Sequence, residues 1–185
     1  AGAGNTITFN GTIADDSAAS ISGTSIAAGQ GAGINVVSGL VIFNGDNTYT
    51  GRTNLMGGVL QAQDHEGINA ASNINFAGGV LQSNGVFSRY LGTGPDRVQW
   101  TGSGGFAAAG GDLTVRLSNG GSLLWGSGNF VPVGSALLFG SDSADSDVHF
   151  TNQIQLGGHM RTIIANGGAQ GENLVYLDGR ISNGS

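Results

Sequence analysis

The sequence predicts an all-β fold, a right-handed parallel β-helix (solenoid) built of short glycine-rich rungs of about 21 residues. Three observations lead to this fold class. Glycine supplies 36 of the 185 residues, against roughly 7% in average proteins, and glycine inside a helix costs about 1 kcal/mol relative to alanine. The apolar residues form short runs of the kind found in strands. Short segments also recur along the chain, which is typical of repeat architectures.

The expected strands follow one another at close spacing. In chain order, apolar runs occur at residues 7–9, 40–43, 59–60, 123–125, 137–139 and 163–164. At residues 113–117 apolar and polar residues alternate, which predicts a half-buried strand. Clusters of Gly, Asn, Asp and Ser, such as residues 44–47 and 118–121, separate the runs, and they supply the positive φ that tight turns need. No helical periodicity extends beyond about two turns.

Three pairs of segments resemble each other. They are Asn54–Gln61 with Asn75–Gln82, Leu123–Ser127 with Leu137–Ser141, and Ile7–Ile13 with Val175–Ile181. The first pair shares six of eight residues at a step of 21, and the second has a step of 14. A step of 21 suits one rung of a β-helix, and roughly eight or nine rungs stacked at about 4.8 Å would form a rod on the order of 40 Å long. A β-sandwich, which also has many short strands, is the alternative.

One segment carries a denser motif. An apolar strand at residues 40–43 is followed by Gly-Asp-Asn-Thr-Tyr-Thr-Gly-Arg-Thr and then by Gly-Val-Leu. This run resembles the passenger-associated transport repeat of bacterial autotransporters, also called the autotransporter-associated β-strand repeat. The residues that fit its pattern are Gly45, Asn47, Thr48, Tyr49, Thr50, Gly51, Thr53, Gly58 and Leu60. The resemblance implies a secreted or cell-surface β-helical passenger that is carried across an outer membrane, a route that the lack of cysteine fits.

The resemblance also suggests how the single domain, residues 1–185, is organised. Residues 39–61 hold the motif, residues 62–165 are similar to the spacer rungs between such repeats, and residues 166–185 begin a further repeat-like rung. Physically, Asn47 and Thr48 can bond neighbouring backbone groups, the Tyr49 hydroxyl can cap a rung edge, and Gly51 and Gly58 mark turns. We therefore expect the motif to be structural.

Composition excludes several classes of function. The net charge is −6, and the six basic residues are all arginine, which argues against nucleic-acid binding. The absence of cysteine removes disulfides, thiol catalysis and thiolate metal sites. No apolar run approaches the ~18 residues of a membrane-spanning helix. The chain does not open on a secretion signal, and it carries no translocator barrel, so we expect a mature or excised segment that could not secrete itself.

The most acidic stretch, residues 141–149, offers candidate Ca²⁺ ligands. Asp142, Asp145 and Asp147 could bind through oxygen, although their spacing is not that of an EF-hand. An exposed acidic turn is the alternative. Residues 92–98 partly match a calcium-binding nonapeptide, but that motif works through tandem copies. We expect no bound cofactor.

The remaining polar and aromatic residues have ordinary interpretations. Asp64-His65-Glu66 should form a solvated loop whose side chains do not converge, because consecutive residues of a strand face opposite sides. The three histidines (His65, His149, His159) and six arginines (Arg52, Arg89, Arg97, Arg116, Arg161, Arg180) are dispersed, although the arginines could line a groove for acidic sugars. For Tyr90, Trp100, Phe106, Trp125, Phe130 and Phe139 we expect mostly core packing, with stacking on sugar rings as the alternative.

These expectations favour a non-enzymatic structural module: a rigid stalk, fibre subunit or passenger shaft of an extracellular or outer-membrane-attached bacterial protein. Uncharged columns of Gly, Ser, Thr and Asn could stack and hydrogen-bond between rungs. The open strand edges at the two ends should pair with neighbouring repeats or with other copies of the chain. An adhesin that binds glycans or host proteins along one face is the first alternative, and a polysaccharide-acting enzyme with clustered carboxylates or arginines is the second.

Overall fold

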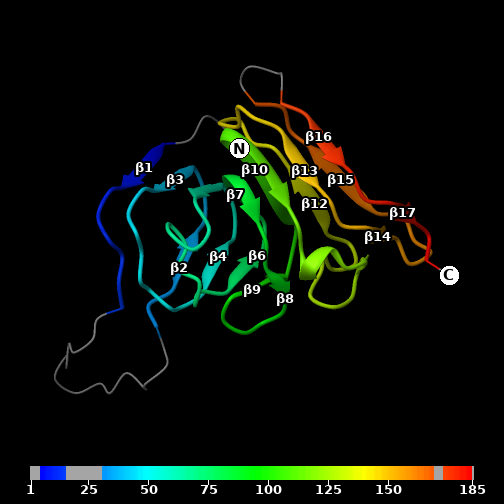
Figure 1. The fold of residues 1–185 in the computed structure, drawn as a ribbon, viewed down its shortest axis with the longest axis horizontal. Helices are drawn as coiled ribbons and strands as arrows, with labels where there is room; N and C mark the ends of the chain where they lie inside the picture. The colour runs from blue at the N-terminus through cyan, green and yellow to red at the C-terminus, as the bar shows by residue number, and fades with distance from the viewer. Residues whose placement is uncertain (1–4, 16–30, 169–172, 185) are drawn as a thin grey trace.

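The computed structural model describes residues 5–15, 31–168 and 173–184. These residues form three β-sheets in which every strand pair is parallel (Figure 1). The all-β prediction is therefore confirmed, and the sheets are compatible with a β-solenoid. The β-sandwich alternative is excluded for the described residues, because its sheets are antiparallel.

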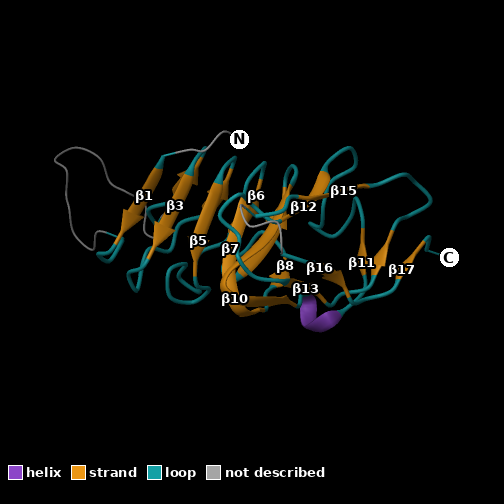
Figure 2. Cartoon of the chain, turned by 90° about the horizontal axis from the view of Figure 1, so that it is seen from above, coloured by secondary structure: helices purple, strands orange, loops and turns teal. Residues whose placement is uncertain are grey.

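The largest sheet has nine strands and runs the length of the molecule. It contains β1 (Thr6–Phe9), β3 (Leu40–Phe43), β5 (Val59–Ala62), β7 (Val80–Phe87), β10 (Gly104–Val115), β12 (Ala136–Phe139), β13 (Val148–Phe150), β15 (Thr162–Ala165) and β16 (Val175–Leu177). Figure 2 shows β1, β3, β5 and β7 lying side by side in chain order.

Two smaller sheets complete the fold. The five-stranded sheet contains β2 (Ile34–Val36), β4 (Thr53–Leu55), β6 (Ile74–Phe76), β8 (Tyr90–Leu91) and β9 (Arg97–Trp100), and the three-stranded sheet contains β11 (Leu123–Leu124), β14 (Ile154–Gln155) and β17 (Ile181–Ser182). The helical content of the described residues is one 3-10 turn, η1 (Ser118–Gly120), so none of their helices could cross a membrane.

The chain alternates between sheets, and we call each return to the largest sheet one pass. Between β3 and β7 each pass adds one strand to the largest sheet and one to the five-stranded sheet. Leu40 pairs with Val59, and Val59 with Val80, so successive passes advance by 19 and 21 residues. The repeat of Asn54–Gln61 in Asn75–Gln82 is confirmed as a register, because Asn54 pairs with Asn75 and Gln61 with Gln82.

The expected rung of uniform length does not extend along the whole chain. Gly105 pairs with Val80 and with Leu138, which are steps of 25 and 33 residues. The longer passes contain the long strands β7 and β10, of 8 and 12 residues. The pairing of these two strands shifts register between Ala108 and Leu113. In the described part of the chain, seven strands, rather than eight or nine, lie along the main path of the largest sheet.

Two of the three sequence similarities do not mark stacked positions. Leu123 lies in β11 and pairs with Ile154, whereas Leu137 lies in β12 and pairs with Gly104. The step of 14 therefore relates two faces of one pass. Likewise, β1 pairs with β3, whereas the similar segment at Val175–Leu177 pairs with β13. β1 and β16 belong to one sheet but do not pair with each other, so likeness alone does not identify neighbouring strands.

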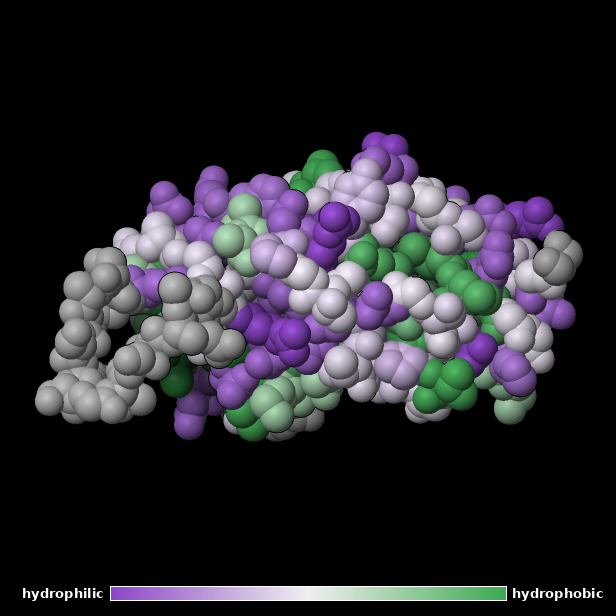
Figure 3. Space-filling view, turned by 90° about the horizontal axis from the view of Figure 1, so that it is seen from below, coloured by the Kyte–Doolittle hydropathy of each residue, from purple (hydrophilic) through white to green (hydrophobic). Residues whose placement is uncertain are grey.

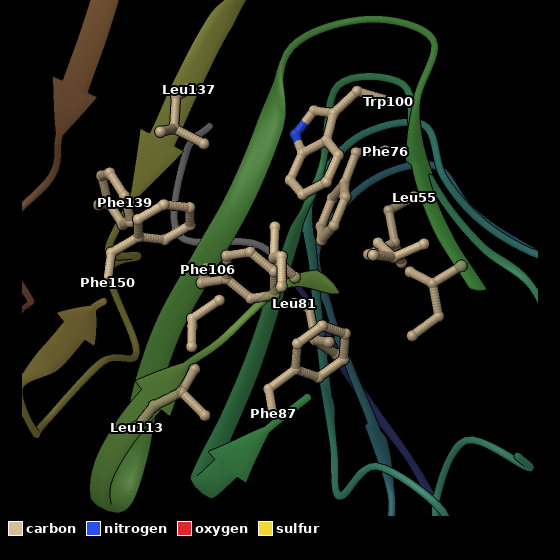
Figure 4. Packing of buried hydrophobic residues seen from close by; sticks show 14 of the residues in the cluster. Leu55, Phe76, Leu81, Phe87, Trp100, Phe106, Leu113, Leu137, Phe139 and Phe150 are labelled. Carbon is tan, nitrogen blue, oxygen red and sulfur yellow. The ribbon is translucent and has the colours of Figure 1, made fainter. Parts of the chain in front are cut away.

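A continuous apolar core runs through the stacked strands (Figure 4). One of its columns is formed by register partners Leu55, Phe76 and Trp100, and the rings of Phe76 and Trp100 stack at 4.6 Å. A second column contains Leu60, Leu81, Phe106 and Phe139. Each such side chain contributes about 1.5–3 kcal/mol when it is fully buried.

Candidate functional site

Within the motif of residues 39–61, the Asn47 side chain contacts the pass before it and the pass after it. The buried Asn47 side chain accepts a hydrogen bond from the backbone N–H of Ile13 at 2.7 Å through Oδ1. Its Nδ2 donates to the carbonyl of Gly67 at 2.8 Å. The sequence suggested a local turn contact, but the partners lie 34 and 20 residues away. Asn47 therefore fastens one pass to the pass on either side.

Tyr49 and Thr53 begin a buried chain of hydroxyl groups. Tyr49 Oη lies 2.7 Å from Thr53 Oγ1, which lies 2.8 Å from Ser72 Oγ, and Ser72 donates to the carbonyl of Gly51 at 2.7 Å. Because each hydroxyl has one proton, the chain runs from Tyr49 to Thr53 to Ser72 to Gly51. Tyr49 is fully buried, and burial raises the pKa of its hydroxyl.

The glycines of the motif permit close backbone stacking. A Cβ on Gly45 would collide with the carbonyl oxygen of Gly11, and one on Gly51 with that of Gly31. Gly58 has a φ of +65° and a Cβ there would lie 2.5 Å from the carbonyl oxygen of Gly39. Only glycine combines that φ with that approach at no cost. Leu60 of the motif lies in the core.

The exposed threonines of the motif hold the first described pass. Thr48 donates its backbone N–H to the carbonyl of Ile13 at 2.9 Å. Thr50 donates to Asp15 Oδ2 through its side chain at 2.5 Å and through its backbone N–H at 3.0 Å, and Ala32 N–H donates to Asp15 Oδ1 at 2.7 Å. The Thr50 hydroxyl and these amides hold the pKa of Asp15 below its ordinary value.

Arg89 and Asp64, which both follow the motif in the chain, form a buried ion pair. Arg89 Nε and Nη2 donate to Asp64 Oδ1 at 2.9 and 2.6 Å, and Arg89 Nη1 donates to the carbonyl of Ser72 at 2.5 Å. The Arg89 side chain is fully buried, and that of Asp64 is 10% exposed. The expected solvated loop is therefore wrong for Asp64, and Arg89 is not a surface residue. This pair connects with the hydroxyl chain through Ser72.

His65 follows Asp64 at the surface. Its φ of +68° turns the side chain back, so that Nε2 lies 3.7 Å from Asp64 Oδ2 and 3.4 Å from Asp96 Oδ1. The expectation that these neighbours do not converge is thus wrong for the first two members of the trio. The loop at 92–98 is fastened by Asn73, whose Nδ2 donates to the carbonyls of Gly92 and Gly94.

Two of the three candidate calcium ligands use their carboxylates within the stack. Asp145 Oδ1 accepts the backbone N–H of Gly110 at 2.8 Å, and Asp147 Oδ1 accepts that of Leu174 at 2.8 Å. Asp142 is exposed. In the part of the chain that the structure describes, no three His, Asp or Glu side chains are grouped as metal ligands. Asp145 and Asp147 link passes instead of converging.

The other dispersed residues occupy separate places. His149 Nδ1 lies 3.0 Å from Asp178 Oδ2, and its ring stacks on Tyr176 at 4.5 Å. Arg97 lies over the ring of Tyr90, and Arg161 donates to the carbonyl of Leu156. The other candidate aromatics, Trp100, Phe106, Trp125, Phe130 and Phe139, are buried, as expected, while Tyr90 is exposed.

Polar ladders run along the outside of the stack. Asn75 Nδ2 donates to Asn54 Oδ1 at 3.2 Å, and Asn54 Nδ2 to Asn35 Oδ1 at 2.8 Å. Asn44 Nδ2 donates to Asn10 Oδ1 at 2.9 Å. The expectation that uncharged polar columns bond between rungs is confirmed at these positions.

A shallow hollow of about 400 Å³ lies beside the first residues of successive strands. Gly39, Gly58 and Gly78 form one side, and Ser141, Asp142 and Ser143 form part of the other. The hydroxyl groups of Ser141 and Ser143 donate to Gln82 Oε1 at 2.6 and 2.8 Å. These hydroxyl protons are therefore engaged within the protein, and Asp142 is the charged side chain of the hollow.

Comparisons with protein-family models, curated proteins and solved structures found no match to this chain.

Sequence reasoning missed the Arg89–Asp64 pair and the hydroxyl chain. A usable signal was present for the pair, because Asp64 and Arg89 carry opposite charges and lie 25 residues apart, the same step that separates Val80 from Gly105. The hydroxyl chain had no such signal, since serine and threonine occur throughout the sequence.

Proposed function

We propose that the chain is a right-handed parallel β-helix and that it works as a non-enzymatic structural segment, a rigid stalk, fibre subunit or passenger shaft of a bacterial cell-surface or secreted protein. Closure into a helix is supported by the alternation of β3, β4, β5, β6 and β7 between two parallel sheets. The right hand is supported by the strong bias, about 98%, of connections between parallel strands of one sheet.

One observation carries the structural role: side chains buried between passes are used to join passes. Asn47 bonds the passes on either side of it, and Arg89 bonds Asp64 one pass away. A protein that uses its buried polar groups in this way resists bending and sliding between passes. The family resemblance of residues 39–61 and the absence of cysteine support the proposed surface location.

Rigidity can be measured directly, because the chain has no cysteine to interfere with labelling. Val37 follows β2 directly and Met160 shortly precedes β15, and both side chains are exposed. Spin labels at V37C and M160C should give a narrow distance distribution, because β2 and β15 lie toward opposite ends of the molecule in Figure 1. The control pair is V37C with M56C, which lie one pass apart on hydrogen-bonded segments and report the width due to the labels alone. A much broader end-to-end distribution than the control would overturn the proposed shaft.

A second test addresses the role of a spacer. The chain is fused between an outer-membrane anchor and an epitope, and a Gly/Ser linker of equal length serves as the control. The shaft should hold the epitope clear of the surface and allow a bulky antibody to bind, whereas the flexible linker should not. Equal antibody binding by the two fusions would contradict the proposal.

The adhesin alternative is favoured by one feature, the stacked and partly exposed pair His149 and Tyr176 beside Asp178. Aromatic rings beside a carboxylate are suited to stack on a sugar and to accept hydrogen bonds from its hydroxyl groups. Glycan-array binding that is lost in Tyr176→Ala but kept in Tyr90→Ala would support this alternative. The absence of binding by the unaltered chain would remove it.

A further inference from the structure

Within the described part of the chain, the main path of the largest sheet ends at β1 and β15, with β16 at the end of a side branch, and both β1 and β15 present an unprotected strand edge. Among the described residues β1 pairs only with β3, and β15 only with β12. Neither Thr6–Phe9 nor Thr162–Ala165 contains a charged residue or proline, the usual protection of an edge strand. Their apolar side chains are exposed: Ile7 55%, Phe9 43%, Ile163 39% and Ile164 41%.

The two edges have matching faces. Phe9 packs edge-on against buried Phe43 at 5.6 Å, so Ile7 and Phe9 face the core and Thr8 faces outwards. At the other end, Ile163 and Ala165 pair with the buried residues Leu137 and Phe139. Ile163 and Ala165 therefore face the core, and Ile164 faces outwards.

The backbone groups at the two edges are also complementary. Leu40 and Asn44 donate to the carbonyls of Asn5 and Phe9, so the alternate residues Thr6 and Thr8 direct their amides and carbonyls away from β3. Asn166 donates to the carbonyl of Phe139, so Ile163 and Ala165 direct theirs away from β12. Parallel pairing of the two edges satisfies these groups at one set of registers, and any two registers of that set are shifted from each other by an even number of residues.

The sequence of the edges selects one of those registers. Residues 6–11 read Thr-Ile-Thr-Phe-Asn-Gly and residues 162–167 read Thr-Ile-Ile-Ala-Asn-Gly. Within the molecule, Asn44 already stacks on Asn10 with a hydrogen bond, and the absence of a side chain at Gly45 lets it approach the carbonyl of Gly11. Placing Asn10 over Asn166 would continue this Asn ladder and glycine contact across the junction.

We propose that a second copy of this chain adds its β1 to β15 as a parallel strand, with Thr6 opposite Thr162 and Asn10 opposite Asn166. The junction extends the largest sheet from one molecule into the next. Because the β1 edge of one copy meets the β15 edge of another, the contact is head-to-tail and builds linear filaments or rings. Figure 3, which views the molecule from below, shows the broadest apolar patch of that side in the half toward the C-terminus. This inference rests on the proposed structural role and specifies how that role extends between molecules.

Engineered cysteines test the register. Thr8 and Ile164 are opposed and outward-facing in the proposed junction, and adjacent parallel strands bring their Cα atoms to about 4.8 Å, within disulfide reach. The T8C/I164C variant, oxidised at high concentration, should give a ladder of dimers, trimers and larger species on a non-reducing gel. The matched control T6C/I164C represents the register shifted by two residues and should give far less.

Each remaining outcome decides the question. A stronger ladder from T6C/I164C, or dimers from T8C alone equal to those from the double variant, would overturn the proposed register. Monomeric unaltered protein in light scattering and electron microscopy at high concentration would overturn the junction itself. Ile163→Arg should abolish assembly while circular dichroism still shows the β-fold of the monomer. A monomer that keeps a narrow end-to-end distance would refute the junction but leave the proposed shaft standing.

Discussion

Replacing Asn47 with alanine tests whether the motif stabilises the stack through contacts between passes. The substitution leaves the Ile13 N–H and the Gly67 carbonyl without the partners that Asn47 supplies at 2.7 and 2.8 Å. Alanine fills less space at this buried position, so a small cavity adds to the lost bonds. The first three described passes should therefore lose their connection together.

The structure sets the size of the effect. Each group that loses its partner costs about 1–3 kcal/mol, so the two groups together should lower the free energy of unfolding by about 2–6 kcal/mol. For a domain of this size that corresponds to a fall in melting temperature of roughly 2–4 °C per kcal/mol. The Asn47→Asp variant should also be destabilised, because its carboxylate keeps the acceptor for Ile13 but faces the Gly67 carbonyl without a proton to donate.

Denaturant unfolding followed by tryptophan fluorescence measures this change, since Trp100 and Trp125 are buried in the native state. The matched control is Asn44→Ala, which removes an exposed Asn–Asn contact three residues earlier and should cost at most about 0.5 kcal/mol. If Asn47→Ala costs no more than Asn44→Ala, the reasoning about fastening between passes is refuted. An unchanged m-value would show that the native fold is retained.

Three further predictions concern the ion pair, a glycine and a tyrosine. Arg89→Met should destabilise by about 3–5 kcal/mol because it leaves the Asp64 carboxylate poorly solvated, and adding Asp64→Asn should restore part of that loss in thermal melts. Gly58→Ala should lower the melting temperature more than Gly85→Ala, since both have positive φ but only the first Cβ would meet backbone; equal losses would contradict the stacking argument. The raised pKa of Tyr49 means that its contribution to stability is complete below about pH 10 and is lost as pH rises through the folded-state pKa. Urea titrations at pH 8 and 11 should show a smaller pH dependence for Tyr49→Phe than for the unaltered chain.

The sequence predicts the register best where the chain repeats itself. Asn54–Gln61 and Asn75–Gln82 preserve six residues because stacked strands place equivalent side chains in the same environment. Leu60 and Leu81 fill the same core column, and Gln61 and Gln82 bond to each other at 3.4 Å. The step of 21 could therefore be predicted directly from the residues.

The longer passes could not be predicted in this way, for a physical reason. Beyond β7 the chain bends at glycines and adds faces, and a bend requires only small residues, which are everywhere in this sequence. The segment of residues 140–147 connects β12 to β13. It covers part of the outer surface, where Ala144 packs with Val80 and Ala107. Its hydrophobic pattern is too short to distinguish from a turn.

The polar contacts within the stack were predictable as a class but not as pairs. Asparagine ladders follow from repetition of the same residue at the same register position. The partners of Asn47 and Arg89 are different residue types on passes of unequal length. Only the three-dimensional register brings them together.

The identical Gly-Gly-Val-Leu-Gln stretches at residues 57–61 and 78–82 have a consequence for how such a protein changes over generations. They lie one pass apart and occupy equivalent positions in the stack. Recombination between their coding segments would delete or duplicate one complete pass and leave the junction sequence intact. The length of the protein can thus vary in whole passes, with each change restoring the same neighbours on either side of the new joint.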